Sequence, residues 1–226
     1  MKIQYNEREN VLNRIYKILP KYAIIPIVAS LLLNMIIYFG SRLFTTQMYH
    51  YDFSIVVDGY IPFVSEWVII YVLAYIAWGV GFVVIGRENR EVCYSVMAAE
   101  QVAKLICLAC FVIIPSTIVR PEITGTGFCE WLSRLVYNMD SPDNLFPSIH
   151  CLESWICFRG AMKCKKVGNT YKIFMFVAAV LVFASTVFVK QHVFVDILGG
   201  IAVVEIGLFV SKRFRLSRIY YKTEKK

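Results

Sequence analysis

Two residues in the last quarter of the chain have the types and spacing of a nucleophile and its partner. His192 and Asp196 are four residues apart, and on a helix this spacing puts both side chains on one face. A carboxylate bonded to one imidazole nitrogen fixes the tautomer and leaves the other nitrogen basic. Such a histidine acts as a nucleophile or general base. The alternative is a histidine at a helix start that is hydrogen-bonded only for structure, and the pair alone leaves both interpretations open.

A second polar group, Pro147-Ser148-Ile149-His150, opens an otherwise apolar stretch. Proline suits the first turn of a helix, where free N–H groups and the helix dipole favour an anion. Ser148 adds a hydroxyl group, and His150 could protonate a leaving oxygen. Arg120, earlier in the chain, offers a permanently charged planar group that suits phosphate. Together with the His192 pair, these groups predict a phosphoryl-transfer site.

The elements that must position these residues are membrane spans. The chain is 58% hydrophobic and only 18% charged, whereas soluble domains contain about a quarter charged residues. Its apolar runs are long enough to cross the hydrocarbon layer as helices. The sequence therefore predicts an all-α fold, a polytopic membrane bundle of six transmembrane helices. The six runs are 22–39, 63–85, roughly 96–119, 146–162, 173–189 and 193–210.

The basic residues predict how this bundle is oriented. Most of the 24 Lys and Arg lie in the tail 1–21, the turn 86–92, the segment 159–172 and the tail 212–226. By the positive-inside rule, both tails are cytoplasmic and the six-helix domain spans 22–211 in the cell membrane. The net charge of +8 then reflects topology and contact with anionic lipid at the cytoplasmic face. It does not indicate binding to nucleic acid.

In this topology the chemistry-bearing residues meet at one membrane face. Polar groups at membrane depth tend to face the bundle interior and to be functional. Six such residues fall at the extracytoplasmic ends of the predicted spans: Arg120, Ser148, His150, Lys190, His192 and Asp196. Their convergence at a shared depth is a stronger signal than any one of them alone.

These motifs resemble those of the phosphatidic acid phosphatase type 2 and haloperoxidase superfamily, across roughly residues 55–205. One family motif, Pro-Ser-Gly-His, is similar to residues 147–150. Another, Ser-Arg-x5-His-x3-Asp, matches Ser185-Thr186, His192 and Asp196 with its full spacing. The resemblance implies that His192 is the nucleophile, which forms a phosphohistidine, and that Asp196 orients it. It also implies that His150 is the general acid, that Arg120 and Ser148 bind phosphate, and that no metal or cofactor takes part.

Three positions depart from the family pattern. Ile113 stands where a lysine is expected, Thr186 where an arginine is expected, and Ile149 replaces the glycine. Two cationic phosphate ligands are therefore missing, and Lys190 could replace one of them. A phosphodiester carries less charge than a phosphomonoester, so a site with fewer cations suits a diester better. Lipid phosphotransferases similar to inositol phosphorylceramide synthase act on such groups.

Two classes of function thus follow for the chain. The first is an integral membrane lipid phosphate phosphatase, with a lipid phosphotransferase as the alternative within the same class. The second is a non-catalytic membrane protein or transporter, for which the intramembrane residues Glu100, Lys104, Glu153 and Glu205 could form a path. Glu100 and Lys104 are expected to pair with each other, while Glu153 could orient His150 or pair with a base elsewhere. The lipid and the oligomeric state are not predicted.

The predicted orientation can be tested by cysteine labelling. In a cysteine-free background, Thr126→Cys should react with a membrane-impermeant maleimide in intact cells, because residue 126 lies in an extracytoplasmic connection. Gly168→Cys should react only after the cells are opened. The reverse pattern would put the histidines on the cytoplasmic side and would overturn the orientation.

Overall fold

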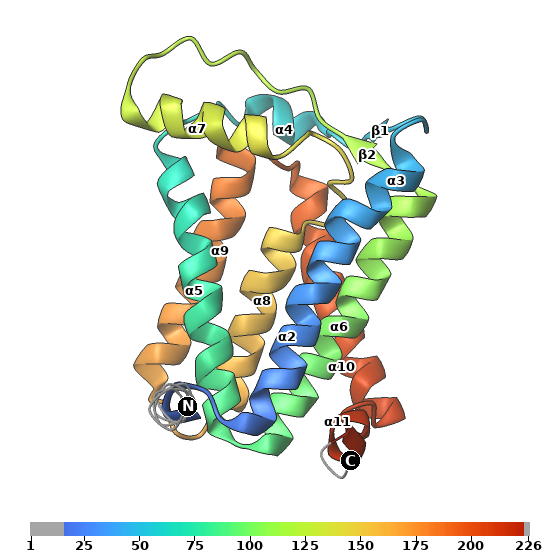
Figure 1. Cartoon of the computed structure of the whole chain (residues 1–226). Helices are drawn as coiled ribbons and strands as arrows, with labels where there is room; N and C mark the ends of the chain where they lie inside the picture. The colour runs from blue at the N-terminus through green and yellow to red at the C-terminus, as the bar shows by residue number, and fades with distance from the viewer. Residues whose placement is uncertain (1–15, 224–226) are drawn as a thin grey trace, which may run out of the picture.

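The structure, a computed structural model, describes residues 16–223, and within them the fold is all-α (Figure 1). The only strands in this part are two short ones, β1 (Tyr51–Asp52) and β2 (Ser116–Thr117), which pair in parallel. The helices are α2 (Lys21–Met35), the π-helix η1 (Ile36–Gly40), α3 (Ser41–Thr45), α4 (Val56–Tyr60), α5 (Trp67–Glu88), α6 (Arg90–Ile113), α7 (Phe128–Met139), α8 (Ile149–Lys163), α9 (Asn169–Phe188), α10 (Phe194–Phe214) and α11 (Arg218–Thr223). Of the predicted N-terminal tail, residues 1–15 lie outside the described part.

Five helices are long and apolar enough to cross a membrane, and they indicate a multi-pass membrane protein. They are α5, α6, α9, α10 and the continuous helix Lys21–Thr45, which is formed by α2, η1 and α3. All five coincide with predicted runs. They stand roughly side by side, so that their apolar outer surfaces face away from the bundle (Figure 1).

The fourth predicted run is a different kind of helix. Within it, α8 has 15 residues, about 22 Å at 1.5 Å per residue, which is shorter than the roughly 30 Å hydrocarbon layer. It packs against α5, α6, α9 and α10, and most of its side chains are buried. Because neighbouring helices surround it, α8 does not need an apolar surface, and it can carry His150, Glu153 and Arg159.

A short amphipathic helix, α7, covers one end of the bundle and was not predicted. It lies across the upper ends of the long helices, near α4 (Figure 1). Its residues Leu132 and Val136 pack against Val68, Tyr71 and Val189. We call this the α7 end of the bundle, and the loops that join α6 to α8 and α9 to α10 meet here.

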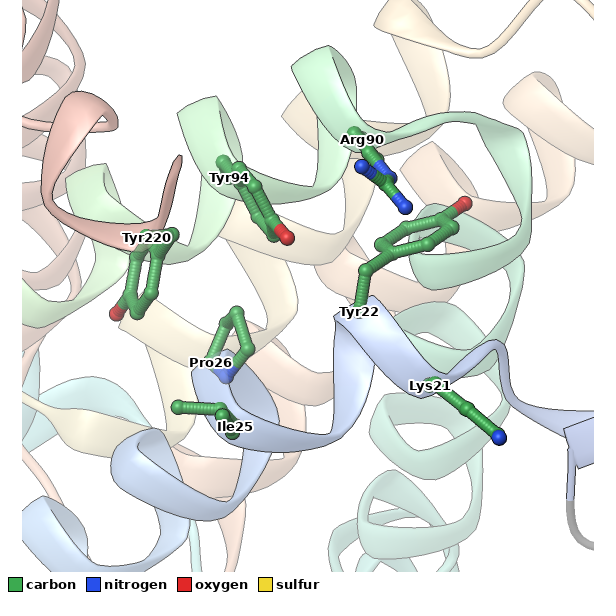
Figure 2. Close-up of a pocket in the computed structure, with 7 residues that line it drawn as sticks. All are labelled: Lys21, Tyr22, Ile25, Pro26, Arg90, Tyr94 and Tyr220. Atoms are coloured by element: carbon green, nitrogen blue, oxygen red, sulfur yellow. The ribbon is translucent and has the colours of Figure 1, made fainter. Parts of the chain in front are cut away.

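The opposite end of the bundle is closed by the C-terminal helix. After α10, Arg215 takes a left-handed conformation with φ 54°, and α11 turns back toward α2 and α6. The Tyr220 ring lies 5.3 Å from the Tyr94 ring, measured between centroids. Together with Lys21, Tyr22, Ile25, Pro26 and Arg90, these two tyrosines line a small cavity of about 300 Å³ (Figure 2). The predicted basic tail 212–226 thus includes the last turn of α10 and a packed helix.

The close packing of α10 on α6 predicts a large effect for one glycine. A Cβ at Gly207 of α10 would collide with the carbonyl oxygen of Ala99 in α6. Overpacking of this kind costs about 1–3 kcal/mol, so Gly207→Ala should lower the midpoint of detergent-induced unfolding. Gly79→Ala is the matched control, because a Cβ at this lipid-facing helical glycine meets nothing within 4 Å. Equal stability of the two variants would contradict the tight α6–α10 contact.

Candidate functional site

His192 and Asp196 form a hydrogen-bonded pair at the start of α10. The distance from His192 Nδ1 to Asp196 Oδ2 is 3.1 Å, and the two residues are 8% and 1% exposed. The pairing was predicted, but its geometry differs from the expected helix face. Val193 is the N-cap of α10, so His192 lies before the helix and the pair spans the N-terminus.

The local fold explains why the pair forms. Asp196 is the third residue of α10, and its Oδ2 also accepts a hydrogen bond of 3.1 Å from the backbone N–H of Val193. A carboxylate at this position favours a helix start because it satisfies a free N–H and complements the helix dipole. Asp58 adds a second anchor, since its Oδ1 accepts from the N–H of Phe194 at 2.7 Å. The Asp196 carboxylate therefore both caps α10 and holds the His192 imidazole.

His150 lies opposite His192 within a group of aromatic rings. The centroids of the two imidazoles are 6.0 Å apart. His150 stacks on Tyr71 at 4.2 Å and contacts the edges of Tyr75 and Trp78. Its Nδ1 lies 3.4 Å from the Tyr71 hydroxyl, and its Nε2 is buried without a hydrogen-bond partner among the described residues. The rings hold His150 in place and leave Nε2 for a ligand.

Ser148 joins the starts of the two helices. It is the N-cap of α8, where its Oγ accepts from the N–H of Cys151 at 3.3 Å. Its own N–H donates to the carbonyl of Asp196 at 3.2 Å, and Gly200 lies close against the Ser148 carbonyl. The proline precedes the N-cap instead of occupying the first helical turn.

Arg120 reaches the residue next to His192. Its Nη2 donates to Gln191 Oε1 at 2.6 Å and its Nη1 donates to the Asp140 carbonyl at 2.6 Å. The guanidinium lies 4.6 Å above the Tyr137 ring. Burial raises the pKa of Tyr137 to about 12, so its hydroxyl remains protonated and donates to the Val189 carbonyl at 2.8 Å. Burial also lowers the pKa of Arg120, and its Nε has no partner within the described part of the chain.

Lys190 has a structural anchor that the sequence did not indicate. It takes a left-handed conformation with φ 52° in the loop between α9 and α10. Its Nζ donates to the backbone carbonyls of Asp58 at 3.1 Å and Ile61 at 2.5 Å. Lys190 therefore ties the loop that carries His192 to α4, and at least two of its three N–H donors are used.

A cavity of about 520 Å³ opens beside the two histidines. Its wall includes His150 and His192 and many apolar side chains from η1, α5 and α7, such as Phe39, Val72 and Leu135. Arg120, Ser148, Lys190 and Asp196 are absent from the wall. The cavity therefore presents the two imidazoles to a largely apolar space, and the other predicted site residues are not part of its wall.

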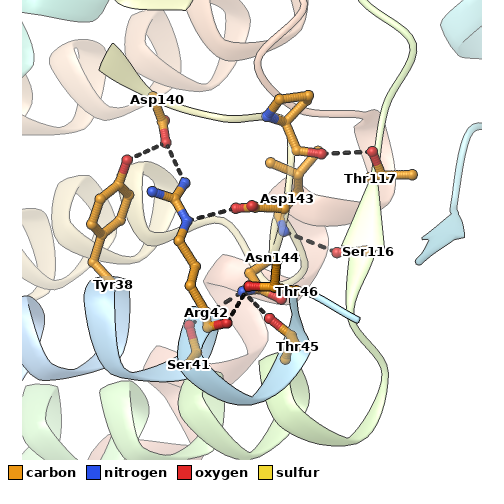
Figure 3. A network of polar contacts seen from close by, with 12 residues as sticks. Tyr38, Ser41, Arg42, Thr45, Thr46, Ser116, Thr117, Asp140, Asp143 and Asn144 are labelled. Carbon is orange, nitrogen blue, oxygen red and sulfur yellow. Dashed lines mark hydrogen bonds and ion pairs between the residues drawn. The ribbon is translucent and has the colours of Figure 1, made fainter. Parts of the chain in front are cut away.

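Sequence reasoning missed Arg42, which is the one Lys or Arg among the described residues that line this cavity. Its Nε is 2.8 Å from Asp143 Oδ1 and its Nη2 is 3.3 Å from Asp140 Oδ1. Tyr38 donates to the same Asp140 oxygen at 2.7 Å. Figure 3 shows this network joining the end of the first long helix to the loop before α8. No motif marks Arg42, and only its position after the first apolar run could have pointed to it.

The two positions that lack the expected cation have clear structural surroundings. Ile113 is 73% exposed at the end of α6 and does not line the cavity. Thr186 is fully buried, and its hydroxyl donates to the Phe183 carbonyl at 2.8 Å. A long cationic side chain would point away from the cavity at the first position and lacks space at the second.

Comparison with known proteins adds nothing to this geometry. Neither a protein-family model, nor a curated protein, nor a solved structure matches the chain. The resemblance to the phosphatidic acid phosphatase type 2 superfamily therefore rests on the motif residues, and functional inference depends on the arrangement of the site.

The His192 pair predicts a defined tautomer. With Asp196 accepting from Nδ1–H, the ¹⁵N spectrum of histidine-labelled protein should show His192 with Nε2 unprotonated above the pH at which the ring loses its charge. Asp196→Asn should still cap Val193 through its amide oxygen, but it should reduce the preference for this tautomer. Asp58→Asn is the control, because Asp58 contacts α10 at Phe194 and makes no hydrogen bond to the imidazole. An unchanged His192 signal in Asp196→Asn would contradict the pairing.

Proposed function

We propose that the chain is an integral membrane lipid phosphate phosphatase in which His192 is the nucleophile. The observation that carries the proposal is the pairing of His192 with a buried carboxylate, in the wall of a cavity that also presents a second histidine. Residues 42 positions apart in the sequence thus bring two imidazoles within 6.0 Å of each other. A nucleophile and an acid on opposite sides of one phosphoryl group require such an arrangement.

In the proposed reaction, Nε2 of His192 attacks the phosphorus atom of the lipid. The P–N bond forms as the P–O bond to the lipid alcohol breaks, and His150 gives its proton to the departing oxygen. Asp196 stabilises the positive charge that develops on the His192 ring. A water molecule then attacks the phosphohistidine, gives its proton to His150 and releases phosphate. Both histidines return to their starting states.

Phosphate binding is assigned to donors beside the two rings. Arg120 has an unpartnered Nε and is held next to His192 through Gln191. Ser148 lies at the N-terminus of α8, where backbone N–H groups and the helix dipole favour an anion. Lys190 has a third N–H donor besides the two that bind backbone carbonyls. None of these groups is in the cavity lining, so the phosphate would have to reach beyond the cavity wall to meet them.

The apolar cavity wall supports a lipid as the substrate. Phe39, Val72 and Leu135 would contact hydrocarbon, while the imidazoles would contact the head group. In this proposal α8 is the sixth crossing, shielded by its neighbours, and the α7 end with its histidines faces the extracytoplasmic side. Both termini are then cytoplasmic, and their basic residues contact anionic lipid.

One observation favours a second candidate function, in which the phosphoryl group is transferred to an acceptor hydroxyl instead of water. Arg42 is the one Lys or Arg in the described cavity wall, and it pairs with two carboxylates, Asp140 and Asp143, which exceed its charge. Such a wall offers no net positive charge to a phosphomonoester, which carries nearly two negative charges. A lipid phosphotransferase that acts on singly charged phosphodiesters, similar to inositol phosphorylceramide synthase, fits this charge better.

The proposal predicts a large loss of activity in one variant. His192→Ala should reduce turnover of labelled lipid phosphates by roughly 10⁴-fold or more, because the covalent intermediate can no longer form. Purified protein should be assayed with phosphomonoesters and phosphodiesters, with and without an alcohol acceptor. Phosphate release identifies a phosphatase, and acceptor-dependent product identifies a transferase.

His50→Ala is the matched control for this assay, since His50 does not line the cavity. It should retain wild-type turnover. Acid-labile phosphate should accumulate on wild-type protein and be absent from the His192 variant. Full activity of His192→Ala would exclude the mechanism, and wild-type protein inert toward every lipid would favour a non-catalytic function.

A further inference from the structure

A cluster of charged side chains lies inside the bundle, away from the histidines. Lys104 of α6 forms ion pairs with Glu100 on its own helix and with Glu153 of α8, the latter at 2.7 Å. Ser30 of α2 donates to Glu100 at 2.7 Å and accepts from the Lys104 ammonium at 3.1 Å. Glu153 thus pairs with Lys104 and does not orient His150. Three helices contribute to the cluster.

The cluster has one carboxylate more than it has cations. Glu100, Lys104 and Glu153 are 0%, 1% and 5% exposed, so water does not screen their charges. Each carboxylate uses Oε1 for Lys104, while Glu100 Oε2 and Glu153 Oε2 are buried without partners among the described residues. A buried charge without a partner is strongly disfavoured, and such a group usually becomes neutral instead.

Among the described residues, Lys104 is the one cation that forms an ion pair with Glu100 or Glu153. Titratable groups on the surrounding helices that interact electrostatically with the cluster include the thiols of Cys107 and Cys157 and the hydroxyl of Tyr220. All three are neutral or negative. Arg159, which is also on α8, already forms an ion pair with Glu205 at 2.8 Å.

We propose that this cluster is a proton-binding site, in which one proton is held by the Glu100 and Glu153 carboxyl groups around Lys104. A proton removes the excess charge and converts one unpartnered oxygen into a hydroxyl group. A metal ion fits poorly, because the Lys104 ammonium already occupies the position between the two carboxylates and would repel a second cation.

The position of the cluster connects it with the cavity. Asn34 and His150 both line the cavity. Ser30 lies one helical turn from Asn34, and Glu153 lies one turn from His150. Asn34 Oδ1 is a further buried oxygen without a partner within the described residues. The proton site therefore lies about one helical turn from the cavity wall. Its existence does not depend on the chemistry proposed for the histidines.

Infrared spectroscopy of the full-length protein in detergent tests whether Glu100 and Glu153 together hold one proton. Wild-type protein at neutral pH should show the C=O band of a protonated carboxyl group in an apolar environment, and the band should shift in D₂O. Glu100→Gln and Glu153→Gln should each remove the band, because one carboxylate and Lys104 then balance. Glu205→Gln is the matched control and should keep it, since Glu205 is paired one-to-one with Arg159.

Two results would overturn the proposal: wild-type protein without the band, or a band that persists in either Glu100→Gln or Glu153→Gln. Gel filtration and circular dichroism should confirm that the variants are folded. If either Glu100→Gln or Glu153→Gln does not fold, the other still tests the proposal. Lys104→Met gives an independent check, because both carboxyl groups must then be protonated and the band should roughly double. An unchanged band in Lys104→Met would also contradict the proposal that Lys104 balances one of the two carboxylates.

Discussion

The Asp196 carboxylate organises the end of the bundle in which both histidines lie. It caps α10 through the Val193 N–H and holds the His192 ring, while the Asp196 carbonyl accepts from Ser148 at the start of α8. The two helix starts are therefore joined at one residue, and the distance between His150 and His192 follows from that junction. Helix capping and the orientation of an imidazole usually involve different residues, but here one side chain does both.

The low dielectric of the bundle interior explains the rest of the polar arrangement. Charges are found where another element can meet them, as in the Lys104 cluster and in the pairing of Arg42 with Asp140 and Asp143. The same requirement explains α8, which can carry His150, Glu153 and Arg159 because other helices surround it. A few buried polar atoms, such as His150 Nε2 and Arg120 Nε, have no hydrogen-bond partner among the described residues.

The α7 end of the bundle is built from segments outside the long apolar runs. The helix α7 and the Arg42 network both contribute side chains to the cavity wall. Lys190 and Asp58 hold the α9–α10 loop against α4. The cavity thus combines a rigid junction, which carries the histidines, with an apolar wall built from η1, α5 and α7.

The sequence by itself determined the long helices and the His192–Asp196 contact. Apolar runs form helices because the backbone must satisfy its own hydrogen bonds in hydrocarbon, and residues four apart can meet without help from other elements. Only the tertiary structure decided that His150 faces His192, that Glu153 pairs with Lys104, and that Arg42 lines the cavity. These contacts join residues of different helices, and their distances depend on packing, which local spacing does not encode. The six predicted site residues were expected to share one membrane face, but only packing decided that two of them line the cavity and four do not.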